Sequence, residues 1–90
     1  MSALPAGPLR IAPGLRLQWE EAQQCHVLLY PEGMVQLNAS SAEILGRCDG
    51  SRDAQTLIEE LQQEYPDADL ADDVREFLAA ALANGWLVAA

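Results

Sequence analysis

Residues 28–50 read Leu-Leu-Tyr-Pro-Glu-Gly-Met-Val-Gln-Leu-Asn-Ala-Ser-Ser-Ala-Glu-Ile-Leu-Gly-Arg-Cys-Asp-Gly. Within this stretch, residues 31–33 predict a turn between two strands, because proline restricts φ and glycine accepts a positive φ. A strand is expected at residues 34–38, where the side-chain pattern repeats every second residue. Ser40 and Glu43 have the spacing of a capping box, which marks the start of a helix. The stretch therefore predicts a strand, a turn, a second strand and a short helix in that order.

The sequence on either side extends this arrangement. Alternating side chains predict a strand at residues 15–19, and a run that is apolar on both faces predicts a central strand at residues 25–30. Three strands joined by short loops would then form an antiparallel sheet. The later half of the chain has apolar residues at helical spacing and predicts helices at residues 41–48, 52–65 and 70–83. The expected fold class is α+β, with a three-stranded antiparallel sheet followed by three helices.

The beginning of the chain differs from the rest. Residues 1–14 contain three prolines and two glycines and have no hydrophobic period, so we expect an extended N-terminal arm there. Residues 15–90 are expected to form a single domain, because a chain of 90 residues has room for one hydrophobic core.

The composition is strongly acidic. The chain has 14 aspartates and glutamates against five arginines and no lysine, which gives a formal net charge of −9. Such a charge repels nucleic acid and anionic lipid, so neither is an expected partner. It either keeps the protein soluble or forms a docking face for a basic partner, and both interpretations stay open. No apolar run approaches the ~20 residues of a membrane span and no signal peptide is recognisable, so a cytoplasmic location is expected.

The residues that usually carry chemistry do not form a known catalytic or metal-binding pattern. Cys25 and Cys48 are too few for a disulfide scaffold and, with His26 as the one histidine, supply too few ligands for zinc. Cys25 and His26 are neighbours in an expected strand, so their side chains point to opposite faces and do not pair as nucleophile and base. No phosphate-binding loop, calcium loop or catalytic serine motif is present. We therefore expect a protein that is not an enzyme and that holds no cofactor or metal.

The strand expected at residues 34–38 has the features of a binding surface. It lies at an edge of the expected sheet and contains no proline and no charge, the usual means of preventing edge pairing. The helix at residues 70–83 has an apolar stripe wider than a small core requires. Together they would form a groove in which an extended peptide adds as a further strand. The alternative is that the same apolar residues are simply core.

Several short segments of the chain resemble the PqqD family. They are Pro8-Leu9, Pro13–Leu17, Leu28–Gly33, Leu37-Asn38, Ala42–Leu45, Cys48–Gly50, Asp73-Val74, Phe77-Leu78 and Gly85–Leu87. Proteins of this family are peptide chaperones in the biosynthesis of pyrroloquinoline quinone (PQQ). The resemblance covers about residues 8–88, which is nearly the whole chain.

The resemblance implies a winged-helix-like domain that binds the precursor peptide PqqA and presents it to the radical S-adenosylmethionine enzyme PqqE, without a cofactor of its own. It also implies the binding residues, since related recognition elements hold their peptide along the third strand and the third helix. In this sequence the corresponding residues are Met34, Val35, Gln36, Leu37, Asn38, Val74, Arg75, Leu78 and Leu82. The resemblance thus implies the same groove that the open edge strand predicts.

Other functions and another assembly remain alternatives. An acidic carrier protein would bear phosphopantetheine on a serine at a helix start, and Ser51 precedes the helix expected at residues 52–65; carriers, however, are all-helical. A DNA-binding domain of winged-helix topology would need the lysines that this chain lacks. An open edge strand also allows two copies to pair, so a homodimer is a further alternative.

Overall fold

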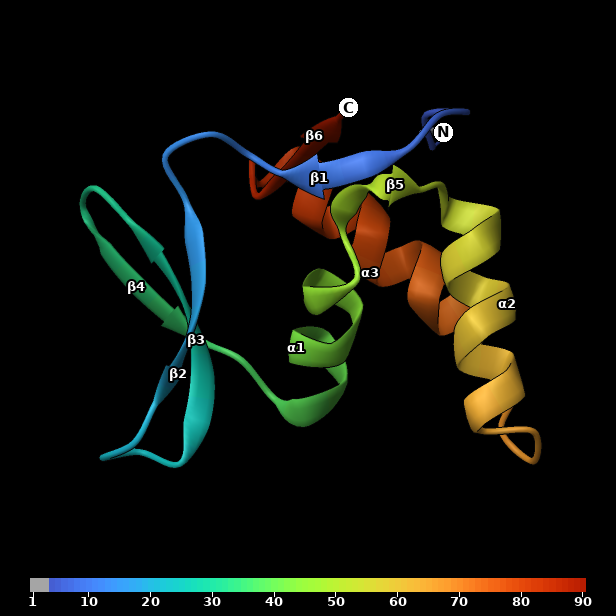
Figure 1. The fold of residues 1–90 in the computed structure, drawn as a ribbon, viewed down its shortest axis with the longest axis horizontal. Coiled ribbons are helices and arrows are strands. Elements are labelled where there is room, and N and C mark those ends of the chain that lie inside the picture. The colour runs from blue at the N-terminus through green and yellow to red at the C-terminus, as the bar shows by residue number, and fades with distance from the viewer. Residues whose placement is uncertain (1–3) are drawn as a thin grey trace.

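The computed structural model describes residues 4–90, and over this range it contains six strands and three helices (Figure 1). The strands are β1 (Leu9–Ile11), β2 (Arg16–Glu20), β3 (Cys25–Tyr30), β4 (Gly33–Gln36), β5 (Asp49–Arg52) and β6 (Leu87–Ala89). The helices are α1 (Ala39–Gly46), α2 (Ala54–Glu64) and α3 (Ala71–Ala83). The expected α+β class is confirmed, as are the three antiparallel strands and the three helices.

The three predicted strands form the first sheet, in the order β2-β3-β4 with antiparallel pairing. Its register places Leu28 of β3 opposite both Leu17 of β2 and Val35 of β4. Because side chains alternate between the faces of a sheet, these three side chains lie in one row on one face. Leu28 is fully buried in the core, so this face packs on the helices, with α1 nearest.

A second sheet, in the order β5-β1-β6, was not predicted from the sequence. Its central strand, β1, lies within residues 1–14, the expected N-terminal arm, and its Leu9 is fully buried. The register pairs Leu9 with Arg52 of β5 and with Ala89 of β6. Strands this short show no clear alternation, and they pair with segments far away in the chain, so only the folded structure defines them. Residues 9–11 of the expected arm therefore belong to the folded core.

The first helix begins at Ala39, two residues earlier than predicted. Its N-cap is Asn38, whose Oδ1 accepts a hydrogen bond of 2.8 Å from the backbone N–H of Ser41. The predicted capping box of Ser40 and Glu43 is therefore wrong. The carboxylate of Glu43 turns instead toward a tyrosine that follows α2, from whose hydroxyl it accepts a hydrogen bond.

The second helix is capped by Asp53, and Ser51 lies before it in β5. Asp53 Oδ1 accepts a 2.8 Å hydrogen bond from the N–H of Thr56, and this bond holds the pKa of Asp53 below its usual range. The helix ends at Glu64, since the residue before Pro66 is disfavoured in helical conformation.

The third helix passes into β6 through Gly85. Its φ of 79° lies in the left-handed region, which glycine adopts without steric cost. The next residue, Trp86, donates its N–H to the carbonyl oxygen of Ala81 at 2.8 Å. This turn directs Leu87, which is almost fully buried, into the core.

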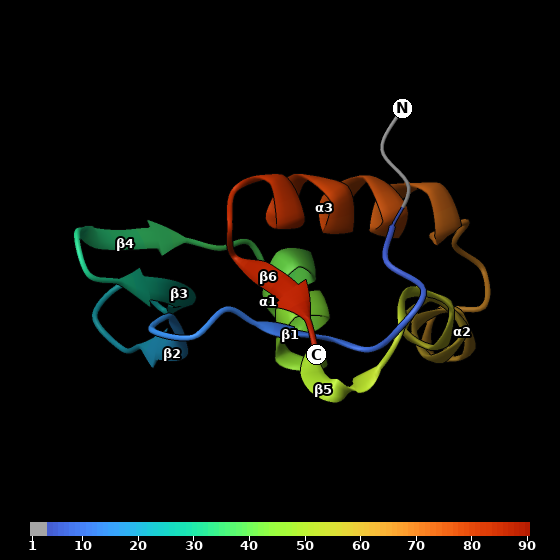
Figure 2. The ribbon, with the colours of Figure 1, turned by 90° about the horizontal axis from the view of Figure 1, so that it is seen from above.

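The two sheets and three helices share one core. Figure 1 shows the first sheet on one side of α1, α2 on the other, and the second sheet across the top. Figure 2 shows β4 on the side of the first sheet toward α3, and β2 on the opposite side. Fully or almost fully buried leucines come from both sheets and from every helix: Leu9, Leu28, Leu45, Leu57, Leu78 and Leu87. Within residues 4–90, no helix has both the length and the apolar character needed to cross a membrane.

We expect the substitution Leu9→Ala to lower the free energy of unfolding by about 2–5 kcal/mol, the cost typical of truncating a buried leucine. The control is Arg10→Ala, which removes an exposed side chain of the same strand and should change that free energy by less than about 0.5 kcal/mol. Urea denaturation followed by circular dichroism measures both variants. Equal stability of the two variants would show that β1 contributes nothing to the core.

Candidate functional site

β4 has a neighbour on one side only, so its outer edge is open in the part of the chain that the structure describes. The backbone N–H of Leu37, just after β4, donates a 2.9 Å hydrogen bond to the carbonyl oxygen of His26 in β3. Residue pairs with and without hydrogen bonds alternate along an antiparallel ladder. Val35, two residues before Leu37, therefore also directs its backbone N–H and C=O groups toward β3. The N–H and C=O groups of Met34 and Gln36 then face away from the sheet. This edge offers free backbone groups and carries no charge and no proline.

The predicted strand residues divide between the two faces of the sheet. Val35 is half-buried and Leu37 is buried in the core, whereas Met34 and Gln36 are exposed. Asn38 is exposed as well, and its side chain caps α1. A strand added to β4 would therefore meet backbone partners along the edge and apolar side chains on the face toward the helices.

The predicted residues of α3 lie in different environments. Val74 and Leu78 are buried, with 3% and 0% of their surface exposed, and Leu82 is half-buried against the core. Arg75 is exposed, with its Nη1 3.8 Å from Oδ1 of Asp72, and it lines a hollow formed with the N-terminal arm and the start of α2. Arg75 thus lies beside the arm and α2 rather than beside β4.

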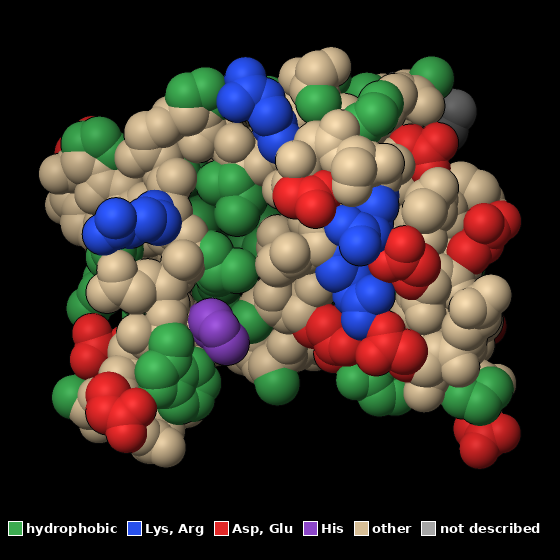
Figure 3. All heavy atoms as spheres, viewed as in Figure 1, with side chains coloured by type: hydrophobic (Ala, Val, Ile, Leu, Met, Phe, Trp, Pro, Cys, Tyr) green, Lys and Arg blue, Asp and Glu red, His purple; other side chains and the backbone are tan. Residues whose placement is uncertain are grey.

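Two arginines join α1, β5 and α2. Arg52 Nε lies 2.9 Å from both carboxylate oxygens of Glu60, and Arg47 Nη1 lies 3.0 Å from Oε1 of the same residue. Arg47 also pairs with Glu43 at 3.3 Å and with Glu64. Figure 3 shows arginine side chains grouped among acidic ones over β5 and α2. The hydrogen bonds from Arg52 hold the pKa of Glu60 below its usual range. Because the pairs are partly exposed, the network orients α1 against α2 more than it stabilises them.

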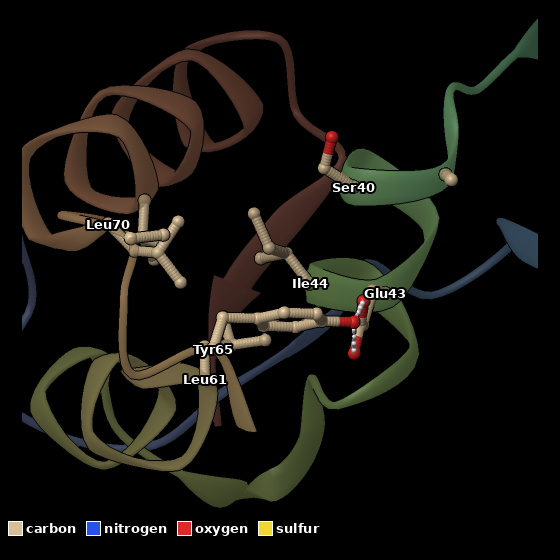
Figure 4. A pocket seen from close by; sticks show the side chains of 9 residues that line it. Ser40, Glu43, Ile44, Leu61, Tyr65 and Leu70 are labelled. Atoms are coloured by element: carbon tan, nitrogen blue, oxygen red, sulfur yellow. Dashed lines mark hydrogen bonds between the residues drawn. The ribbon is translucent and has the colours of Figure 1, made fainter. Parts of the chain in front are cut away.

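A cavity of about 350 Å³ lies between α1, the end of α2 and the start of α3. Figure 4 shows the side chains of Ile44, Leu61 and Leu70 around it. Its lining consists of Ala39, Ser40, Glu43, Ile44, Leu61, Tyr65, Ala68, Leu70 and Val74. Of these residues, only Val74 belongs to the groove predicted from the sequence. Since all three helices contribute to the cavity, no local pattern could have indicated the others.

Tyr65 and Glu43 close one side of this cavity (Figure 4). The hydroxyl of Tyr65 donates to the carboxylate of Glu43, with 2.9 Å to Oε2 and 3.2 Å to Oε1. This hydrogen bond raises the pKa of Tyr65, because a tyrosinate would face the carboxylate. The cavity has apolar walls and one polar rim, which suits an apolar side chain of a ligand.

Ser51 does not occupy the start of a helix. Its Oγ donates a 2.5 Å hydrogen bond to Oδ1 of Asp49, and its backbone N–H donates to the same oxygen at 3.0 Å. These bonds hold the pKa of Asp49 below its usual range. Since Asp53 is the N-cap of α2, the helix-start position predicted for Ser51 is wrong.

The cysteines occupy different environments. Cys48 is buried, its Sγ lies 3.3 Å from the carbonyl oxygen of Ile44, and burial raises the pKa of its thiol to about 11. The thiol is therefore protonated near neutral pH. Cys25 is half-buried. From residue 4 onward, no three His, Cys, Asp or Glu side chains are grouped so as to hold a metal ion.

Comparison with known proteins relates the chain to one family. The family model of coenzyme PQQ synthesis protein D (PqqD) matches residues 25–87. A similar solved structure is the solution NMR structure of the PqqD truncation of Methylobacterium extorquens PqqCD, described as a stand-alone recognition element for ribosomally synthesised and post-translationally modified peptides. The TM-score is 0.70 at 30% identity, over 89% of this chain and 87% of that one.

Three curated relatives are similar to most of the chain. The PqqA binding protein of Methylococcus capsulatus is 47% identical over 87 residues, which are 97% of this chain and 94% of that protein. The PqqA binding protein of Azotobacter vinelandii is 51% identical over 75 residues, 82% of each chain. PqqA binding protein 1 of Pseudomonas putida is 49% identical over 79 residues, 87% of each chain. These matches confirm the resemblance, and the chain belongs to the PqqD family.

Proposed function

We propose that this chain is a peptide chaperone of PQQ biosynthesis that binds the precursor peptide PqqA as an added strand on β4. The observation that carries the proposal is the open edge of β4, where the N–H and C=O groups of Met34 and Gln36 face outward. Backbone pairing of this kind supplies affinity for an extended peptide. The relatives named PqqA binding protein indicate which peptide it is.

The cavity beside α1 supports a second part of the proposal, which concerns side-chain recognition. Its walls are mostly apolar, and it opens at the first turn of α1, just after the chain leaves β4. A peptide strand that extends past Gln36 would reach this opening, where one apolar side chain would enter above Val74. Main-chain pairing would then supply affinity, and the cavity would supply selectivity. The roles predicted for Arg75, Leu78 and Leu82 in the groove stay predictions.

The proposal includes presentation of the bound peptide to the radical S-adenosylmethionine enzyme PqqE in the cytoplasm, without chemistry by this chain itself. Support comes from the family description, which refers to PQQ synthesis, and from the relatives' names, which refer to binding alone. A peptide bound as a strand is extended, so alternate side chains face away from the protein that holds it. Those side chains would be accessible to the enzyme that modifies the peptide.

The substitution Gln36→Pro should weaken PqqA binding by about tenfold or more, because proline removes an outward N–H group and leaves the hydrogen bonds to β3 in place. The matched control, Gln36→Ala, removes the same side chain but keeps the N–H, so its affinity should stay within about twofold of the unmodified protein. Calorimetric titration with synthetic PqqA measures both. Undiminished affinity of Gln36→Pro would contradict strand addition, and no binding by the unmodified protein, alone or with PqqE, would contradict the ligand.

The substitution Ser40→Phe places a ring at the opening of the cavity and should lower the affinity for PqqA by about fivefold or more, because the peptide side chain is excluded. Gln63→Phe adds the same ring at an exposed position of α2 outside the cavity and serves as the control. The same titration compares the two variants. If both bind PqqA as tightly as the unmodified protein, the cavity takes no part in recognition.

A further inference from the structure

Three large hydrophobic side chains from residue 4 onward are exposed to a similar degree: Trp19 at 46%, Tyr65 at 45% and Met34 at 44%. Met34 and Tyr65 belong to the peptide site proposed above. Trp19 lies on β2, at the opposite edge of the first sheet from β4 (Figure 2). Because exposed tryptophans commonly anchor protein interfaces, Trp19 indicates a second surface that the peptide site does not account for.

Trp19 forms one wall of a hollow between the first sheet and α1. Its ring meets the ring of His26, its partner in the register, edge to face, with 5.1 Å between the centroids and 72° between the planes. The hollow has a volume of about 360 Å³. Its lining consists of Trp19, Gln24, Cys25, His26, Leu37, Asn38, Ala39, Ala42 and Glu43. We refer to it as the Trp19 hollow.

The surroundings of the Trp19 hollow are acidic. Glu21 Oε2 accepts a 2.7 Å hydrogen bond from the indole Nε1 of Trp19, which orients the ring, and Glu43 lines the hollow itself. Glu21 forms no ion pair with any arginine of residues 4–90, whereas Glu43 is paired with Arg47. Figure 3 shows hydrophobic and acidic side chains together along the lower edge of the molecule. An exposed indole with carboxylates nearby attracts the cationic group of a lysine or arginine.

We propose that the Trp19 hollow docks a partner protein through a lysine or arginine side chain of that partner. The net charge of −9 adds attraction for a basic surface and speeds association. Since Trp19 lies on β2, at the opposite edge of the sheet from β4, a partner anchored on its ring leaves the outer edge of β4 open to the peptide. The inference rests on the proposed function, in which a second protein receives the peptide that β4 holds.

Calorimetric titration with purified PqqE in the presence of PqqA tests this inference. Trp19→Ala should weaken PqqE binding by about tenfold or more and leave PqqA binding within about twofold, because an anchoring aromatic contact is lost while β4 is unchanged. The control is Gln18→Ala. The side chain of Gln18 is next to Trp19 in the sequence but points to the opposite face of β2, so its removal should affect neither titration. Raising NaCl from about 50 mM to about 300 mM should lower the affinity for PqqE by about fivefold or more.

A second variant keeps the ring and changes only the charge. The substitution Glu21→Gln should weaken PqqE binding by about threefold. Unchanged PqqE affinity in this variant and in Trp19→Ala overturns the inference, as does failure of the unmodified protein to bind PqqE. If Trp19→Ala loses PqqA binding to the same extent, the hollow belongs to the peptide site. If Trp19→Ala converts a dimer to a monomer, the hollow binds a second copy of the chain. Either result overturns the inference. The proposed function is tested separately, by PqqA binding to the unmodified protein alone.

Discussion

The first sheet meets the helices through one face, and the row of Leu17, Leu28 and Val35 on that face holds it there. A slip of one residue in the register would turn this row toward solvent, so the buried face specifies the register strongly. The register in turn determines which backbone groups of β4 point outward. The free groups of Met34 and Gln36, and the position of Trp19 opposite His26, are consequences of the same row.

The second sheet and the arginine network keep the helices in place behind this face. β1 joins a segment near the middle of the chain, β5, to the final strand, β6, and Leu9 and Leu87 supply the burial that makes the pairing favourable. Arg47 and Arg52 connect α1 and β5 to α2 through shared carboxylates. As a result α1 has a defined position, and the cavity on one side of it and the Trp19 hollow on the other are both preformed.

The two edges of the first sheet differ in chemistry, so each edge suits a different ligand in the proposed function. β4 is short, uncharged and free of proline, which suits a ligand recognised through its backbone. β2 carries an exposed tryptophan beside glutamates, which suits a ligand recognised through a cationic side chain. A protein that holds a peptide at one edge and a second protein at the other brings the two together without chemistry of its own. The proposed docking gives the acidic composition a part in recognition.

The parts of the structure that depend on neighbouring residues could be predicted from the sequence. Alternation indicated β2 and β4, an apolar run indicated β3, and helical spacing indicated the three helices. The absence of charge at residues 34–38 indicated the open edge. Only the tertiary structure decided the second sheet, the cavity and the Trp19 hollow. The physical reason is that pattern and propensity are properties of consecutive residues. The pairing of Leu9 with Ala89, and a cavity walled by three helices, exist only when distant segments meet.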